Sequence, residues 1–244
     1  MATSPLFDAI RAAAPTVSVG MLTADLLNLG AEITRLERAA ARLVHFDVMD
    51  GCFCPMTTIG PPVVKAVRSP VLFKDVHLMI TDPVQKVADY VKAGADIVTV
   101  HAEADRHIHR VFQELAAMTN VNDPHRGLVR GIALNPGTPL EVIEPLLDQV
   151  ELVLLLAINP GWSGQQFGAE TPRRLAQARR FIVDSRRDIL LGVDGGITRA
   201  NIADVARLRP DIIVTGSAVF DGKAPEENAR FMLETIAAAV AETV

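Results

Sequence analysis

The sequence predicts an α/β fold, a single (β/α)8 barrel in which eight parallel strands alternate with helices. The length of 244 residues is typical of one such barrel. Short β-branched apolar runs alternate with longer amphipathic stretches, which is the pattern of βα units. The units are evenly spaced and no Gly-x-Gly-x-x-Gly follows the first run, so a closed barrel is favoured over an open doubly wound sheet.

Eight apolar runs are the predicted strands. They are rich in Val, Ile and Leu, a composition typical of parallel strands that are buried on both faces. They span residues 17–22, 43–48, 71–78, 97–100, 129–134, 152–158, 189–193 and 212–215. Three helices between them are expected to begin where a capping oxygen precedes a proline, namely Asp82 before Pro83, Thr138 before Pro139 and Thr171 before Pro172.

The whole chain, residues 1–244, is predicted to be one barrel domain. Residues 1–16 are an N-terminal extension, expected to form a helix that closes the barrel floor. The barrel core covers residues 17–222, and residues 223–244 are a C-terminal helix. Residues 118–127 contain Asn-Asp-Pro-His and are predicted to be a surface loop. Neither the extension nor this loop is expected to carry chemistry.

Composition excludes several classes of protein. A net charge of −5 argues against a nucleic-acid partner, because binding to phosphate backbones needs clustered Lys and Arg. The longest clean apolar run, residues 152–158, is far shorter than the roughly 20 residues that a membrane helix needs. Cys52 and Cys54 are expected to be a free reduced pair, and no secretory signal is recognised, so we expect a cytoplasmic protein whose partner is a small molecule.

Polar side chains gather at the ends of three predicted strands. His45 and Asp47 lie two residues apart, so strand alternation puts both on one face, while His77 and Asp194 end two other strands. Each alone is most simply a hydrogen-bonded core residue. Together they favour a site for one divalent metal ion, Zn, Fe, Mn or Co. The adjacent Met49 and Met79 either fill gaps in the core or form a dry wall around the reacting carbon.

The loops after the last three strands are rich in glycine. They read Asn159-Pro160-Gly161-Trp162-Ser163-Gly164-Gln165, Asp194-Gly195-Gly196 and Gly216-Ser217. Each glycine alone is explained by turn formation. Three consecutive loops of this kind favour a phosphate site, because the backbone N–H groups of glycines can crowd around an anion and such loops often hold phosphate in barrels.

These residues resemble the ribulose-phosphate 3-epimerase family. The matching stretches, in order, are His45-Phe46-Asp47-Val48-Met49-Asp50-Gly51, Ile59-Gly60-Pro61-Pro62-Val63-Val64, Asp75-Val76-His77-Leu78-Met79, Val100-His101-Ala102-Glu103, Leu134-Asn135-Pro136, Asn159-Pro160-Gly161, Val193-Asp194-Gly195-Gly196 and Gly216-Ser217-Ala218-Val219-Phe220.

The resemblance implies a barrel of the ribulose-phosphate-binding type and a homo-oligomer, either a dimer or a hexamer. It implies that His45, Asp47, His77 and Asp194 hold the metal and that the two aspartates are the catalytic acid–base pair. Met49 and Met79 would shield the reacting carbon. The phosphorylated ketose would be bound by His77, Gly161, Trp162, Ser163, Gly164, Asp194, Gly195, Gly196, Gly216 and Ser217.

The sequence departs from the family pattern around the sugar. Gly20 replaces a serine of the first strand, Cys52 and Met56 replace a histidine and an asparagine, and Leu156 replaces a methionine. Gly192 replaces a glutamate, and Trp162-Ser163-Gly164 replaces Phe-Gly-Gly. Because lost polar contacts change the discrimination between sugars, we interpret this as retained chemistry with an altered substrate-binding rim.

D-Ribulose 5-phosphate, epimerised at C3 to D-xylulose 5-phosphate, is the best single candidate for the substrate. The alternatives are a tetrulose or hexulose phosphate, or a sugar-phosphate-binding paralogue without efficient catalysis. A decarboxylase of the same superfamily is the weakest interpretation, because that chemistry calls for a lysine at the strand ends and Lys74 is the single lysine nearby.

Overall fold

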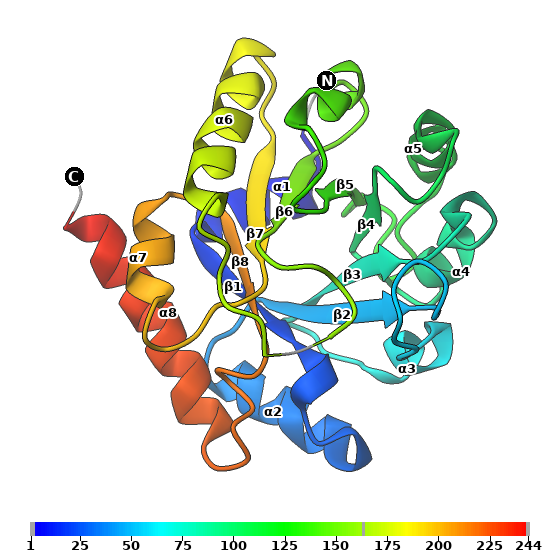
Figure 1. Cartoon of the computed structure of the whole chain (residues 1–244). Coiled ribbons are helices and arrows are strands. Elements are labelled where there is room, and N and C mark those ends of the chain that lie inside the picture. The colour runs from blue at the N-terminus through cyan, green and yellow to red at the C-terminus, as the bar shows by residue number, and fades with distance from the viewer. Residues whose placement is uncertain (1–2, 163, 243–244) are drawn as a thin grey trace.

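The computed structural model describes residues 3–162 and 164–242, and within them eight parallel strands close into a barrel (Figure 1). The predicted fold class is therefore confirmed. Neighbouring strands pair in chain order, and β1 pairs with β8 to close the ring. The strands are β1 (Thr16–Gly20), β2 (Leu43–Met49), β3 (Phe73–Met79), β4 (Ile97–His101), β5 (Val129–Leu134), β6 (Leu152–Leu156), β7 (Leu190–Asp194) and β8 (Ile212–Thr215).

Helices surround the barrel, as Figure 1 shows, and bury apolar faces against the outside of the strands. The α-helices are α1 (Pro5–Ala13), α2 (Leu29–Arg38), α3 (Pro61–Ala66), α4 (Val87–Lys92), α5 (Ile108–Ala116), α6 (Thr171–Asp184), α7 (Ile202–Arg207) and α8 (Pro225–Ala241). The 3-10 helices are η1 (Met21–Thr23), η2 (Leu26–Asn28), η3 (Pro83–Gln85) and η4 (Leu140–Leu146). None of the helices described is long and apolar enough to span a bilayer.

Three strand boundaries differ by two residues from those predicted, and the others agree to within one residue. β1 ends at Gly20 because Met21 begins a 3-10 turn. β3 begins at Phe73, and Val71 before it is exposed. β6 ends at Leu156, since the carbonyl of Ala157 already accepts a hydrogen bond from Gly168 of the following loop. Apolar composition extends past the ladder in each case, so periodicity alone placed the ends too far out.

The three predicted helix caps are wrong. Asp82 has a left-handed backbone conformation with φ 51° and its side chain makes no capping bond. The Thr138 hydroxyl donates to Glu103 instead, and Thr171 is already the first residue of α6. Pro83 and Pro172 do lie in the first helical turn, so the prolines marked two of the helix starts although the preceding oxygens did not cap them.

The helix predicted for the N-terminal extension is α1, which covers the N-terminal end of the barrel. Its N-cap is Ser4, whose hydroxyl accepts a hydrogen bond from the Phe7 backbone. Leu6, Phe7 and Ile10 are fully buried against the first residues of the strands, namely Leu43, Ile97, Val129, Leu152, Leu190 and Ile212. The floor of the barrel is therefore closed by apolar packing.

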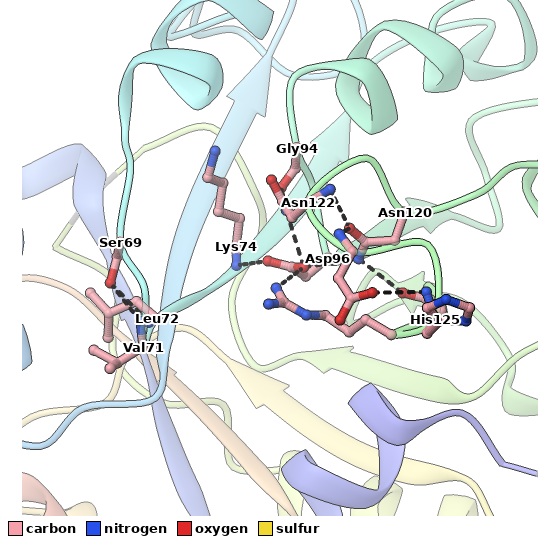
Figure 2. Close-up of polar contacts among 12 residues, drawn as sticks. Ser69, Val71, Leu72, Lys74, Gly94, Asp96, Asn120, Asn122 and His125 are labelled. Atoms are coloured by element: carbon pink, nitrogen blue, oxygen red, sulfur yellow. Dashed lines mark hydrogen bonds and ion pairs between the residues drawn. The ribbon is translucent and has the colours of Figure 1, made fainter.

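A polar cluster with a buried centre, the Asp96 cluster, lies beside this floor and consists of the buried Asp96 and Asn120 with the more exposed Asn122 and Arg126 (Figure 2). Asp96 directly precedes β4 and is 1% exposed. Its Oδ1 accepts from the amides of Asn120 and Asn122 at 2.9 and 3.3 Å and from the Arg126 guanidinium at 3.0 Å. Its Oδ2 accepts from the Lys74 backbone at 2.9 Å. The cluster ties the loop predicted at residues 118–127 to the barrel.

Candidate active site

Strand alternation directs four side chains to one point at the C-terminal end of the barrel. His45 and Asp47 lie on the inner face of β2, and Asp47 pairs in register with His77 of β3. Asp194 ends β7. One ligand atom from each of these four residues lies within 4.8 Å of the other three. The structure thus brings together the four residues that the sequence singled out, and we call them the four-residue cluster.

The geometry of the four-residue cluster fits a divalent metal ion. The nearest pairs are His45 Nε2 and Asp47 Oδ1 at 3.3 Å, and His77 Nδ1 with a carboxylate oxygen of Asp47 and of Asp194, both at 3.6 Å. Two ligands at about 2.1 Å from a tetrahedral metal lie about 3.4 Å apart. His45 Nε2 and His77 Nδ1 are both buried without a hydrogen-bond partner among the described residues, which is the state expected of atoms that coordinate a cation.

The far side of His45 is held by two buried residues. Its Nδ1 lies 2.7 Å from Asp75 Oδ2, and the same oxygen accepts a 2.8 Å hydrogen bond from the Ser18 hydroxyl of β1. All three residues are at most 2% exposed. No role was predicted above for Asp75 or Ser18. Their inward positions in the strand alternation were the available clue.

The far side of His77 contacts a third imidazole. His77 Nε2 lies 2.9 Å from Nε2 of His101 on β4, and His101 Nδ1 lies 3.1 Å from Glu103 Oε2. The Phe53 ring packs on His101 with centroids 4.7 Å apart. His101 and Glu103 were present in the motif quoted above, but their link to His77 depends on strand pairing, which the sequence does not display.

Burial and charge shift the pKa values of these groups strongly. Burial opposes the charged form of His45, but the carboxylates of Asp75 and Asp47 outweigh it and raise the pKa of His45 well above its usual value. Burial also opposes ionisation of Asp47, yet its imidazole neighbours hold the pKa of Asp47 far below the usual range. Burial lowers the pKa of His101 to about 4, so that ring is neutral at pH 7.

A cavity of about 940 Å³ opens above the four-residue cluster. Asp47 and Asp194 line it, as do all described members of the predicted phosphate loops, namely Gly161, Trp162, Gly164, Gly195, Gly196, Gly216 and Ser217. Ser163 lies outside the described residues. The loop conformation requires glycine at position 196, where φ is 67° and a Cβ atom would lie 2.4 Å from the Phe167 backbone nitrogen.

The wall of the cavity over the reacting centre is apolar. Met49 and Met79 line it and pack with Cys54 in a small buried cluster, against which Phe53 and Leu22 also pack. Cys54 and the exposed Cys52 are both free thiols. The two methionines are therefore placed where they can exclude water from the carboxylates, which was one of the two interpretations of them.

The departures from the family pattern fall partly on this cavity. Gly20, Met56 and Leu156 line it, whereas Cys52 is not among its lining residues. A Cβ atom at Gly20 would lie 3.3 Å from the Gly216 Cα, so the two strands approach closely here. Lys74 alternates with the inward-facing Asp75 and donates from Nζ to the Val64 carbonyl at 2.8 Å. Its amine points away from the cavity, which argues against the decarboxylase interpretation.

Comparison with known proteins shows the family to which this chain belongs. The profile of the ribulose-phosphate 3 epimerase family matches residues 16–220. The chain belongs to the ribulose-phosphate 3-epimerase family. Relatives in this family include the chloroplastic ribulose-5-phosphate-3-epimerase of Arabidopsis thaliana, which is 42% identical and aligned over 85% of this chain and 72% of its own length. The ribulose-phosphate 3-epimerase of Bacillus subtilis is 41% identical over 84% of this chain and 91% of its own.

More distant solved structures share the fold. The 3-hexulose-6-phosphate synthase of Salmonella typhimurium superposes with a TM-score of 0.63 at 18% identity and covers 92% of this chain and 99% of its own. KGPDC from Streptococcus mutans gives a TM-score of 0.67 at 17% identity, covering 93% of this chain and 99% of its own. At such identities the likeness shows the barrel alone, so the chemistry of this epimerase-family member is argued from its own site.

Proposed function

We propose that this protein is a metal-dependent epimerase that inverts C3 of D-ribulose 5-phosphate to give D-xylulose 5-phosphate. The observation that carries the proposal is the convergence of two carboxylates, Asp47 and Asp194, with a buried pair of imidazoles beneath a cavity with glycine-rich loops. The family supports the same reaction, since its relatives carry that name.

Inversion at a carbon next to a ketone needs a base on one face and an acid on the other. His77 Nδ1 lies 3.6 Å from a carboxylate oxygen of each aspartate, so the carboxylates of β2 and β7 meet at one point on the wall of the cavity. One aspartate accepts the C3 proton and the other donates a proton to the opposite face of the planar carbon. Met49 and Met79 keep water away, which strengthens these charge interactions.

The four-residue cluster would hold one divalent ion, Zn, Fe, Mn or Co, through the two imidazoles and the two carboxylates. When bound, the ion supplies positive charge that stabilises the developing enediolate. The chain's own contribution is to present two imidazoles, whose facing nitrogens would be free of protons when the ion is bound, and two carboxylates at matching distances. The backbone of Gly164, Gly195, Gly196, Gly216 and Ser217 would bind the phosphate, with Gly161, Trp162 and Ser163 completing that loop.

A second candidate substrate is another ketose phosphate, and the lining of the cavity favours testing it. Met56 and Leu156 are apolar where the family pattern is polar or more flexible, and Gly20 removes a hydroxyl. Fewer hydrogen bonds to sugar hydroxyls weaken discrimination between ketoses. Four further points stay predictions from the sequence: which divalent metal is bound, whether the protein is a homodimer or a homohexamer, the single-domain boundaries, and a cytoplasmic location.

Metal analysis combined with isotope exchange tests the proposal. Purified protein is expected to contain close to one divalent ion per chain and, with ribulose 5-phosphate in deuterated water, to incorporate deuterium at C3. Steady-state rates with tetrulose, pentulose and hexulose phosphates then rank the substrates. A metal-loaded protein that exchanges no C3 hydrogen in any of them would contradict the epimerase and support the paralogue that binds without catalysis.

A further inference from the structure

Two buried imidazoles from neighbouring strands face each other directly behind the four-residue cluster. His77 of β3 and His101 of β4 are both 0% exposed, their Nε2 atoms are 2.9 Å apart, and their ring planes differ by 20°. A hydrogen bond between two ring nitrogens needs one N–H donor and one bare acceptor. The contact therefore ties the tautomer of His77 to that of His101.

Glu103 sets the direction of this bond. Its Oε2 lies 3.1 Å from His101 Nδ1, and a carboxylate can only accept, so His101 carries its proton on Nδ1. In a neutral imidazole the other nitrogen is then bare, and His101 Nε2 accepts from Nε2–H of His77. When His77 is neutral, its one proton is therefore on Nε2 and its Nδ1 is bare, the atom that lies 3.6 Å from carboxylate oxygens of Asp47 and Asp194.

Glu103 is itself held from outside the barrel. Its Oε1 accepts from the backbone of Asn135 at 2.9 Å and from the hydroxyl of Thr138, both in the loop after β5. The Arg174 guanidinium of α6 donates to the carbonyls of Thr138 and Asn135 at 2.8 and 3.1 Å. Burial opposes ionisation of Glu103, but its hydrogen bonds from His101, Thr138 and Asn135 outweigh it and lower the pKa of Glu103 to about 2, so it is a fixed anion at pH 7.

His45 offers a simpler version of the same arrangement. Its Nδ1 bonds directly to the Asp75 carboxylate, which leaves Nε2 bare toward Asp47. A carboxylate behind a ligating histidine is a common way to fix the tautomer and orientation of the ring. At His77 a second imidazole stands between the ligand and the carboxylate.

We propose that His101 and Glu103 are positioning residues for metal binding, which together hold His77 in the tautomer that leaves Nδ1 free to coordinate a divalent cation. This rests on the proposed function, because the cation is the one that the epimerase would use. Neither residue lines the cavity, so both would act through His77 without touching substrate.

Glu103→Gln tests the proposal. The Gln side chain can donate its amide N–H to His101, which favours a bare Nδ1 and an Nε2–H facing His77. His77 would then carry its proton on Nδ1, inside the metal site. We expect the affinity for Co²⁺, measured by chelator competition, to fall about 10- to 100-fold. The visible absorption of the Co²⁺-loaded protein should change as well, which a loss of fold stability alone would not cause.

Glu151→Gln is the matched control. Glu151 and Glu103 have similarly exposed side chains, 24% and 25%. Glu151 likewise accepts a backbone N–H bond, from Arg130 at 2.9 Å, but it precedes β6 at the opposite end of the barrel. We expect its Co²⁺ affinity and spectrum to match those of the wild type, even where its thermal midpoint falls.

A double-mutant cycle that combines Glu103→Gln with His101→Phe tests whether Glu103 acts on His77 through His101, which we call the relay, or whether the two residues act independently. If both residues act through His77, the second substitution adds little to the loss of Co²⁺ affinity caused by the first. Should Glu103→Gln fail to fold, Thr138→Val removes one bond to the carboxylate and is expected to cost a few-fold in affinity.

If Glu103→Gln has the Co²⁺ affinity and spectrum of the wild type, the relay is wrong, but the proposed epimerase activity is unaffected. The same holds for Thr138→Val if Glu103→Gln does not fold. Full additivity in the cycle would also overturn the relay. A wild-type protein that binds no Co²⁺ would overturn the metal site of the proposed function itself, so the two failures are distinguishable.

Discussion

Two polar clusters at opposite ends of the barrel differ in whether their buried nitrogen and oxygen atoms have hydrogen-bond partners. In the Asp96 cluster, at the N-terminal end, no buried side-chain nitrogen or oxygen lacks a partner among residues 3–162 and 164–242. In the four-residue cluster, at the C-terminal end, His45 Nε2 and His77 Nδ1 are buried and unpartnered although each lies within 3.6 Å of a carboxylate oxygen.

This difference indicates that the polar groups at the floor serve stability, whereas those at the mouth serve chemistry. An unpaired buried polar atom costs about 1–3 kcal/mol, so it persists where another interaction compensates it. At the floor, hydrogen bonds hold the connecting segments together and leave no coordination position. At the mouth, the unpaired atoms lie close enough to one another and to the two carboxylates to hold a shared cation. Substitutions at the two ends should therefore affect different measured quantities.

The largest expected effect is at the mouth, with Asp194→Asn. Removing one of the two carboxylates should lower kcat by about 10³-fold or more, which corresponds to about 4 kcal/mol. The free energy of unfolding should change by less than about 1 kcal/mol. Steady-state kinetics and urea denaturation measure the two quantities.

Asp211→Asn is the control for this prediction, because the Asp211 side chain is 14% exposed against 15% for Asp194 but pairs with Arg11 and Arg179 at the floor. It should lose stability and keep kcat. Equal losses of kcat in both variants would contradict the proposal that carboxylates at the mouth serve catalysis and carboxylates at the floor serve stability.

The next effect is at the floor, with Asp96→Asn. The substitution removes the charge that pairs with Arg126 and replaces one acceptor oxygen with an NH2 donor, which must face other N–H donors of the cluster or of the Lys74 backbone. We expect the free energy of unfolding to fall by about 3 kcal/mol, while kcat of the folded protein stays within twofold. Urea denaturation beside activity at 25 °C decides it, and a change below about 1 kcal/mol would show that the cluster is replaceable.

A smaller effect is expected from the pH dependence of stability through His101. Its pKa is about 4 in the folded protein against 6.5 for an ordinary histidine. Between these values the unfolded chain binds more protons, so stability falls as pH decreases. The metal-free wild type should lose roughly 2 kcal/mol relative to His101→Phe between pH 7 and pH 5. If the free energies of unfolding of the two proteins change equally with pH, His101 is not a buried neutral imidazole in the folded protein.

The smallest effect is expected for Gly20→Ser, at the rim of the cavity. The new Cβ would lie 3.3 Å from Gly216 Cα, so the two strands must shift by a few tenths of an ångström. We expect less than about 1 kcal/mol change in stability and a KM for ribulose 5-phosphate lower by several-fold, as a hydroxyl returns to the sugar site. An unchanged KM would show that Gly20 does not set substrate preference.

Much of the fold and part of the site could be predicted from the sequence because they depend on local periodicity. Asp47 and His45 share a face by alternation, and the ends of parallel strands meet at one mouth. Those two rules brought four distant residues to one point. The strand ends and helix caps were less predictable, since Thr138 bonds to Glu103 in the loop after β4 and not to its own helix.

The second layer of the site could not be predicted in this way. Asp75 is recognisable as inward-facing, but its bond to His45 follows from the register of β2 against β3. The contact between His77 and His101 requires the pairing of β3 with β4. The loop at residues 118–127 had the composition of a surface loop, yet Asn120 is fully buried by the Asp96 cluster. Each of these facts depends on strand neighbours that residue patterns leave open.

The apolar seal that α1 forms beneath the barrel has a kinetic consequence. Among the described residues, Leu6, Phe7 and Ile10 close the floor with apolar side chains, so sugars reach the two aspartates through the cavity at the C-terminal end of the barrel. A departing sugar must vacate that passage before the next arrives, and the two sugars differ only in the orientation of one hydroxyl. Each should therefore compete with the other for the empty enzyme, and the direction of net flux should follow their relative concentrations.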